Sequence, residues 1–182
     1  MNILNVNEEL YIDNSITHSE IHSYEPYLPN KLSNNDKIII PVHEIEKYTH
    51  PCESFLYIEG VLSEADGNVS KTLSLINNGV AFLFRELRYQ LNSATINSRR
   101  DVGLTLTLKG YISYTSNESE KLKNANWSPK GVNAITDATT GAFNVCIPLK
   151  MLMGFFEDYK KIIINAANRQ CWKFFLSFQN GR

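Results

Sequence analysis

The residues of this chain best equipped for chemistry are its histidines, and all four lie within the first 50 residues. His18 and His22 have the i, i+4 spacing that places two imidazoles on one helical face, where they can bind a divalent metal ion. Their segment has no helical period, its central glutamate is displaced from the H-E-x-x-H pattern, and no third ligand is evident. We interpret both as solvated histidines and predict no metal site.

The cysteines offer a second kind of chemistry. Cys52, Cys146 and Cys171 are far apart in the sequence and form no C-x-x-C pair, so in a reducing compartment they are expected to be small buried hydrophobic residues. His50 and Cys52 could pair an imidazole with a thiol or bind a soft metal. A two-ligand cluster is common by chance, and we do not interpret it as a site.

The remaining polar groups do not form a recognisable catalytic set. The sequence has no glycine-rich phosphate loop of the G-x-x-x-x-G-K-S/T or G-x-G-x-x-G type and no G-x-S-x-G nucleophile elbow. Neighbouring carboxylates and basic doublets are interpreted as surface charges. We therefore predict no catalytic, cofactor-binding or metal-binding residues, and a protein that is not an enzyme. The groups concerned are Glu44 with Glu46, Glu118 with Glu120, Glu157 with Asp158, Arg99 with Arg100, and Lys160 with Lys161.

Composition and charge limit the other function classes. With 182 residues, 43% of them hydrophobic and 20% charged, the chain suits one folded core and not two ordinary domains. Its 18 basic and 19 acidic residues give a net charge of -1, so no basic field favours direct nucleic-acid binding. The start lacks the features of a signal peptide, and the longest apolar stretch, 142–156, contains Lys150. We expect synthesis in the cytosol and no membrane span.

The pattern of elements indicates a mainly β protein with a few short helices. Twenty asparagines cluster between apolar segments and mark turns. Segment 54–62 has apolar residues on both faces, which is typical of a strand buried between two layers. Two groups of aromatic residues, 82–89 and 155–159, are expected to be mostly core and in part an inter-subunit surface. Strands are expected at 37–42, 54–62, 72–76, 95–97, 142–148 and 160–165, and segment 80–91 is expected to be a short helical entry or turn followed by a strand that includes 88–92. In the strand at 142–148, Phe143, Val145 and Ile147 alternate on one face. Helices are expected at 101–114, 118–124 and 150–159.

Residues 1–35 have no regular period and contain two prolines between Tyr24 and Pro29. We predict an extended N-terminal arm over 1–35, followed by one β-sandwich domain over 36–182.

Four stretches carry a resemblance to a known family. They are NDKIIIPV at 35–42, PCESFLYIEG at 51–60, RDVGLTLTLKGYISY at 100–114 and FNVCIPLKMLMGFFEDYK at 143–160. In this order they resemble the N-terminal half of double jelly-roll major capsid proteins, or hexons, of Polinton-like elements and adintoviruses, including copies integrated in insect genomes. The resemblance runs from about residue 10 to residue 166.

The resemblance implies a jelly-roll β-sandwich and a viral or virus-derived capsid structural protein. Such a protein self-associates into trimeric, capsomer-like units, with other capsid proteins as further candidate partners. The arm would clasp a neighbour. The expected location is the virion, with synthesis and assembly in the host cytoplasm or nucleus. Two jelly rolls need about twice this length, so only the first is expected here, and the tail at 166–182 departs from the family and either completes the sheet or exposes an adhesive edge.

Two other functions remain open on the sequence. The first is a lectin-like β-sandwich module that binds glycan or peptide, for which a concave aromatic cluster around Trp127 would argue. The second is a cupin-like metalloenzyme, which the missing histidine constellation disfavours.

Overall fold

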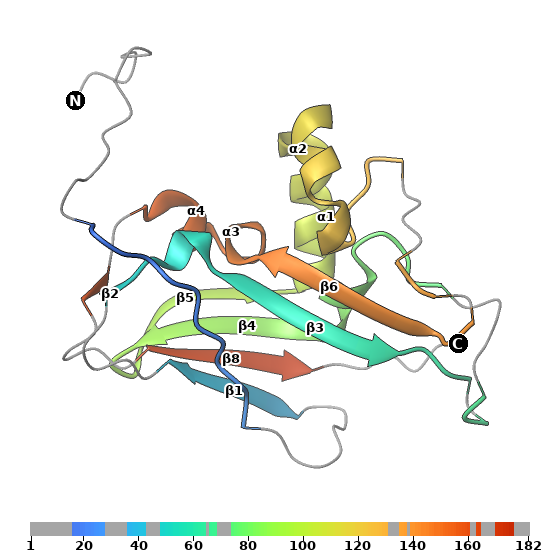
Figure 1. Ribbon diagram of the computed structural model, residues 1–182, viewed down its shortest axis with the longest axis horizontal. Coiled ribbons are helices and arrows are strands. Elements are labelled where there is room, and N and C mark those ends of the chain that lie inside the picture. Colours follow the sequence, from blue (N-terminus) through green and yellow to red (C-terminus); the bar gives the residue numbers. More distant parts are fainter. Residues whose placement is uncertain are drawn as a thin grey trace.

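A computed structural model of the chain describes residues 16–27, 36–42, 48–64, 66–68, 74–130, 135–137, 139–160, 163–164 and 170–176 (Figure 1). The strands are β1 (Lys37–Val42), β2 (Tyr48–Thr49), β3 (Phe55–Val61), β4 (Phe84–Leu91), β5 (Ala94–Arg100), β6 (Ala142–Pro148), β7 (Ile163–Ile164) and β8 (Gln170–Leu176). The helices are α1 (Val102–Ser113), α2 (Ser116–Lys121), α3 (Leu149–Leu152) and α4 (Gly154–Asp158), with 3-10 turns η1 (Pro51–Glu53), η2 (Gly79–Leu83) and η3 (Lys123–Ala125).

The strands pair in a nested antiparallel order. In this order β1 pairs with β8, β2 with β7, β3 with β6, and β4 with β5. This is the pairing of one long hairpin rolled upon itself, and the additional pairing of β4 with β8 joins the β1–β8 and β4–β5 pairs in one sheet. The fold is therefore a mainly β jelly-roll β-sandwich with a few short helices, as the sequence predicted.

Two layers enclose the core. One is the four-stranded sheet in the order β1-β8-β4-β5, and the other is the β3–β6 pair, which lies across it (Figure 1). Leu56 of β3 and Val145 and Ile147 of β6 are buried together with Leu87 and Tyr89 of β4. Helix α3 adds Met151 and Leu152 to the same cluster, α4 adds Phe156, and Met153 between the two helices is buried with them.

Alternation along the strands determines which side chains enter this core. In β4 the apolar residues Leu87 and Tyr89 are buried in it, and polar residues alternate with them, as period-2 geometry requires. In β6 the predicted inward row of Phe143, Val145 and Ile147 is confirmed. Gly60 of β3 lies opposite Phe143, and a Cβ at this glycine would be 2.8 Å from the phenylalanine ring. The glycine therefore makes room for the ring between the two strands.

Asparagines hold two loops together beneath α1. Asn78 and Asn126 both adopt left-handed backbone, with φ of 57° and 61°, which asparagine tolerates better than most residues. The Asn78 N–H donates to the Asn126 carbonyl and the Gly79 N–H to Asn126 Oδ1, both at 2.8 Å. The Ser128 N–H donates to Asn77 Oδ1, also at 2.8 Å. The prediction that asparagines mark turns is confirmed at these positions.

Two large rings fix the orientation of α1. Its Gly103 lies against Phe82 and its Gly110 against Trp127, so closely that a Cβ would be 2.4 Å and 2.3 Å from the respective ring atoms. The Trp127 ring is fully buried, and its Nε1–H donates to Ser119 Oγ at 3.1 Å. These contacts determine which side of α1 faces inward.

Several expectations are confirmed and others are wrong. The turn and strand expected over 80–91, the returning strand beside it, the helix near 101–114 and the strand at 142–148 are present. Residues 74–76 of the expected strand 72–76 are not a strand, and Thr72 and Leu73 lie outside the described residues. The single helix expected at 150–159 is two helices, because Met153 takes an extended conformation between them. The tail supplies β8, which lies between β1 and β4 and thus completes the sheet.

The expectation that β3 is buried on both faces is wrong. Leu56 faces the core, whereas Phe55, Tyr57 and Val61 are each more than half exposed. Within the described part of the chain, no second layer covers the outer face of β3 and β6. Residues 1–15 and 28–35 of the predicted arm, and residues 177–182 of the tail, lie outside the described residues.

Candidate functional site

The arm histidines do not share a helical face. Residues 16–26 contain no regular helix or strand, and Tyr27 forms a single bridge to Ile39 of β1. Glu20 lies between the two imidazoles, 3.9 Å from His18 and 2.9 Å from His22. Across the described residues, no group of three or more His, Cys, Asp or Glu side chains is arranged to hold a metal ion.

The histidine and cysteine flanking Pro51 do come together. Cys52 Sγ lies 3.0 Å from His50 Nε2, and the same nitrogen lies 3.3 Å from the Lys160 carbonyl oxygen. Burial raises the pKa of the Cys52 thiol, and the neighbouring Glu53 adds to this effect. A thiol nucleophile needs a lowered pKa, so the electrostatics of this pair favour an unreactive thiol.

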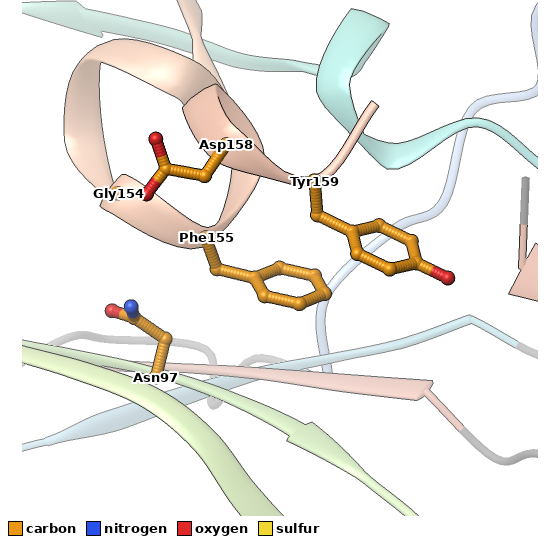
Figure 2. Close-up of a pocket in the computed structure, with 5 residues that line it drawn as sticks. All are labelled: Asn97, Gly154, Phe155, Asp158 and Tyr159. Atoms are coloured by element: carbon orange, nitrogen blue, oxygen red, sulfur yellow. The ribbon is translucent and has the colours of Figure 1, made fainter. Parts of the chain in front are cut away.

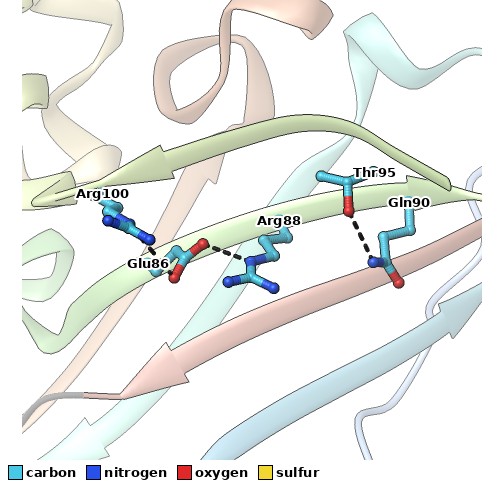
Figure 3. Close-up of polar contacts among 5 residues, drawn as sticks. All are labelled: Glu86, Arg88, Gln90, Thr95 and Arg100. Carbon is cyan, nitrogen blue, oxygen red and sulfur yellow. Dashed lines mark hydrogen bonds and ion pairs between the residues drawn. The ribbon is translucent and has the colours of Figure 1, made fainter. Parts of the chain in front are cut away.

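The charged residues of β4 and β5 form a polar ladder (Figure 3). The nearly buried carboxylate of Glu86 accepts a hydrogen bond from Arg88 and lies 3.9 Å from Arg100, its cross-strand neighbour. Gln90 Nε2 donates to Thr95 Oγ1 at 3.0 Å further along. The hydrogen bond from Arg88 lowers the pKa of Glu86 more than burial raises it. The carboxylate is thus held ionised as part of a structural ion pair.

A second ion pair connects α1 to α4. Lys109 is the only charged residue of α1, and its Nζ donates to Glu157 and, at 3.3 Å, to the Lys150 carbonyl. The lysine side chain is only 15% exposed. The single charge of α1 is therefore engaged within the protein.

One shallow depression of about 340 Å³ lies between β5 and α4 (Figure 2). Phe155 stands at its centre, stacked on Tyr89 at 5.4 Å and on Tyr159 at 4.9 Å between ring centroids. Figure 2 shows Asp158 on α4 above Phe155 and Asn97 on β5 below it, so the lining includes a carboxylate and an amide. Gly154 completes the lining. An aromatic edge next to hydrogen-bonding groups can accept a sugar ring or a side chain.

The other aromatic groups are mostly core, as predicted. Phe84, Tyr89 and Phe156 are buried, and Phe82 is partly exposed where it covers α1. The Trp127 ring has no exposed surface, whereas Tyr111, which packs edge-on against it at 5.0 Å between ring centroids, is 56% exposed. The Trp127 ring itself therefore offers no aromatic platform for a glycan.

Two exposed apolar surfaces stand out on the ordered elements. The first, which we name the helix face, lies on α1 at positions i, i+4, i+7 and i+8. The second, the strand face, consists of alternate residues on the outer side of β3. The helix face comprises Leu104, Leu108, Tyr111 and Ile112, exposed to 57%, 55%, 56% and 82%, and the strand face comprises Phe55, Tyr57 and Val61, exposed to 55%, 60% and 61%.

Sequence reasoning identified neither surface as a site. The sequence nevertheless contains a pattern that could have indicated these surfaces, because segment 54–62 is apolar on both faces and α1 has apolar residues on all sides. Both patterns indicate elements covered on two sides. In the described part of the chain each is covered on one side only.

Comparison with models of protein families identifies the family of the chain. The model of the double jelly roll-like domain matches residues 73–171, which is more than half of the 182 residues. The chain belongs to this family of double jelly roll-like domains, which confirms the family level of the resemblance noted in the sequence. No curated protein and no solved structure matches the chain significantly. No helix in the described ranges is long and apolar enough to cross a membrane.

Proposed function

We propose that the protein is a viral or virus-derived capsid structural protein that self-associates into trimeric, capsomer-like units. The observation that carries this proposal is the nested eight-strand roll of a chain that belongs to the double jelly roll-like family. This type of domain is typical of viral capsid proteins. A capsid subunit also needs outward surfaces that copies of itself can cover, and the helix face and strand face supply such surfaces.

The attribution to Polinton-like elements and adintoviruses belongs to the same proposal and rests on the four sequence stretches given above. So does the division into an arm over 1–35 and one jelly roll over 36–182. The described part of the arm meets β1 of its own chain at one bridge, where the Tyr27 N–H donates to the Ile39 carbonyl at 2.9 Å, and the clasping of a neighbour belongs to the proposal. We place the mature protein in the virion, with other capsid proteins as further partners.

The proposed role is structural and not enzymatic. The polar groups brought together by the fold are engaged in structural contacts, as in the ion pair of Lys109 with Glu157 and that of Glu86 with Arg88. The raised pKa of Cys52 argues in the same direction.

The test is the mass of the purified 182-residue chain as a function of concentration, followed by electron microscopy. We expect a species of three subunits, or larger rings and shells, in equilibrium with monomer. Light scattering that returns the monomer mass over a wide concentration range would refute self-assembly while leaving the fold intact.

Recognition of a glycan or peptide is the second candidate, and the depression beside Phe155 is the observation that favours it. The discriminating measurement is a glycan array probed with the wild-type chain and with the Asp158→Asn variant. Hits that disappear in the variant would support this function. An array without hits would remove the glycan form of it.

A further inference from the structure

The edge strand β5 carries polar side chains where the neighbouring strand β4 carries apolar ones. Arg99 pairs with Leu87 of β4, and Asn97 pairs with Tyr89. Residues directly opposite each other in an antiparallel pair point to the same face of the sheet, and Leu87 and Tyr89 are buried in the core. The side chains of Arg99 and Asn97 therefore lie on the core side of the sheet, at its edge.

Arg99 has no counter-ion among the residues that the structure describes. Its one hydrogen bond there runs from Nη1 to the Met151 carbonyl at 3.4 Å, and it forms no ion pair. The nearby carboxylate of Glu157 is paired with Lys109. Burial lowers the pKa of Arg99, and Tyr114 and Glu157 oppose this effect only in part. Because a guanidinium has five N–H donors in a rigid fork, Arg99 can bind a further carboxylate with two parallel hydrogen bonds.

Asn97 adds a recess to the same side of β5. It lines the depression of about 340 Å³ together with Phe155 and Tyr159 (Figure 2). Its amide forms no hydrogen bond to another described residue. Asp158 lies on the opposite side of Phe155 and is not among the groups that shift the pKa of Arg99. Two side chains of an extended segment, two residues apart, can therefore contact Arg99 and the depression at the same time.

The outer edge of β5 has no strand beside it in the described part of the chain. β5 is the last strand in the order β1-β8-β4-β5, and among the described residues its main chain hydrogen-bonds to no main chain other than that of β4. The Arg100 carbonyl also accepts from Thr105 Oγ1 at 3.3 Å. Such an edge accepts an extended peptide as an additional strand. A second β5 is a poor partner, because this strand has two arginines and no acidic residue.

A segment of the arm has the chemistry that this edge requires. Residues 8–13 read EELYID, and residues 1–15 contain three acidic residues and no lysine, arginine or histidine. In an extended segment, alternation places Glu9, Tyr11 and Asp13 on one face. The segment thus offers carboxylates two residues away from an aromatic ring.

An antiparallel pairing brings these groups into register with β5. When Tyr11 lies opposite Asn97, Glu9 lies opposite Arg99. The tyrosine ring then enters the depression beside Phe155, where its hydroxyl can reach the polar groups of the lining. Every strand pair of the described fold is antiparallel, and this pairing extends the same sheet by one strand.

The arm meets its own sheet at the edge farthest from β5. Tyr27 forms its bridge to Ile39 of β1, and β1 and β5 are the two ends of the four-stranded sheet. Three strand spacings, about 14 Å, separate them. The β5 edge of a neighbouring copy is therefore the acceptor that we assign to the arm.

From these observations we infer that segment 8–13 of one copy adds as a strand to β5 of a neighbouring copy, where Glu9 binds Arg99 and Tyr11 enters the depression beside Phe155. Each copy donates one segment and accepts another, so the contact is heterologous. The inference rests on the proposed self-association and names the two surfaces that meet.

The first test compares two neighbouring arginines in the full chain. Arg99→Gln removes the charge on the core side, whereas Arg100→Gln removes a 78% exposed charge on the other face, 3.9 Å from Glu86. Light scattering over a range of concentrations gives the dissociation constant of the oligomer, and circular dichroism checks folding. We expect Arg99→Gln to raise this constant about 10-fold or more and Arg100→Gln to leave it within about 2-fold of wild type. Tyr11→Ala is expected to weaken assembly to a similar extent.

A charge exchange then identifies the partner of Arg99. Arg99→Glu and Glu9→Arg are each expected to lose the oligomer, because every contact then joins two like charges. In an equimolar mixture, the arm of the first variant keeps Glu9 and β5 of the second keeps Arg99, and the two substituted residues form the reversed ion pair. The mixture is therefore expected to recover the wild-type mass.

Other outcomes overturn the inference and separate it from the proposed function. A monomeric wild-type chain refutes both. If the wild-type chain assembles and Arg99→Gln assembles equally well, the proposed function stands and β5 is not the acceptor. If Arg99→Gln and Arg100→Gln weaken assembly equally, the effect comes from overall charge and not from the core side of β5. A mixture of the charge-exchange variants that stays dissociated excludes the arm as the occupant, whether or not each variant folds.

Discussion

Replacing Gly110 with alanine tests the contact that holds α1 in place. The added methyl would be 2.3 Å from one atom of the Trp127 ring and within 2.6 Å of two others. The ring is fully buried and tied to Ser119 by its Nε1–H, so it has little room to move. Alanine favours a helix over glycine by about 1 kcal/mol, whereas overpacking of a filled core costs about 1–3 kcal/mol and more when the neighbour is rigid. We expect a net loss of about 1–2 kcal/mol.

Two other glycines of helices make the controls. At Gly103 the added methyl meets Phe82, at 2.4 Å, but this ring is 36% exposed and can shift outward. At Gly154, the first residue of α4, no atom lies within 4 Å of the added methyl. The loss of stability is thus expected to decrease from Gly110→Ala to Gly103→Ala, and Gly154→Ala is expected to be neutral or slightly stabilising. The assay is urea unfolding followed by tryptophan fluorescence and circular dichroism.

A Gly110→Ala variant as stable as Gly154→Ala would refute the reasoning. It would mean that the Trp127 ring can move away from α1 at no cost. The orientation of the helix face would then no longer be fixed by the core.

Three further changes concern charge and capping, and each is measured by chemical unfolding against wild type. Glu86→Gln is expected to cost about 1–2 kcal/mol at neutral pH, because Arg88 loses its ionised partner. The folded pKa of Glu86 lies below its ordinary value of 4.5. Its contribution to the free energy of unfolding is therefore complete above pH 4.5 and is lost as the pH falls through the folded pKa. A Glu86→Gln variant whose stability falls in acid as steeply as that of wild type would contradict this assignment. Burial raises the pKa of Tyr114 from 10.0 to about 12. Stability is therefore expected to fall as the pH rises from 10 toward 12. Because burial also raises the pKa of Tyr89, the Tyr114→Phe variant should remove only part of this loss, on the order of 1–2 kcal/mol, and a loss as large as that of wild type would contradict the assignment. Thr115→Ala removes the capping box of α2, in which Thr115 and Glu118 exchange hydrogen bonds. This variant is expected to lower the free energy of unfolding by about 1 kcal/mol. An unchanged free energy of unfolding would show that the contacts of η3 and Trp127 are sufficient to hold α2 in place.

The strands and turns of this protein were largely readable from local sequence. Alternation predicted the buried row of β6, and asparagine-rich turns were expected where Asn77 and Asn78 lie. Helix α1 was predicted over 101–114, although Asp101 holds a left-handed conformation and makes no side-chain cap bond. The strand expected at 72–76 is not formed at residues 74–76. A short apolar run of this kind is compatible with a strand, and equally with a loop that packs an apolar side chain, here Leu75, against the core.

Contacts between distant segments could not be read in this way. The sequence placed His50 and Cys52 near each other but did not indicate that the Lys160 carbonyl joins them. The interior position of Trp127 was likewise hidden, because it depends on the absence of a Cβ at Gly110, seventeen residues earlier. Such contacts depend on how the strands return, which local periodicity does not encode.

The sequence alone predicted that the chain is mainly β, and the order of four of its stretches resembles a capsid jelly roll. The β prediction follows from local alternation and turn chemistry, which act over a few residues at a time. Only the tertiary structure decided that β8 lies between β1 and β4, and that one face each of β3 and α1 is not covered by the described part of the chain. Which face of an apolar element is buried depends on what packs against it, and here those partners come from parts of the chain far away in sequence.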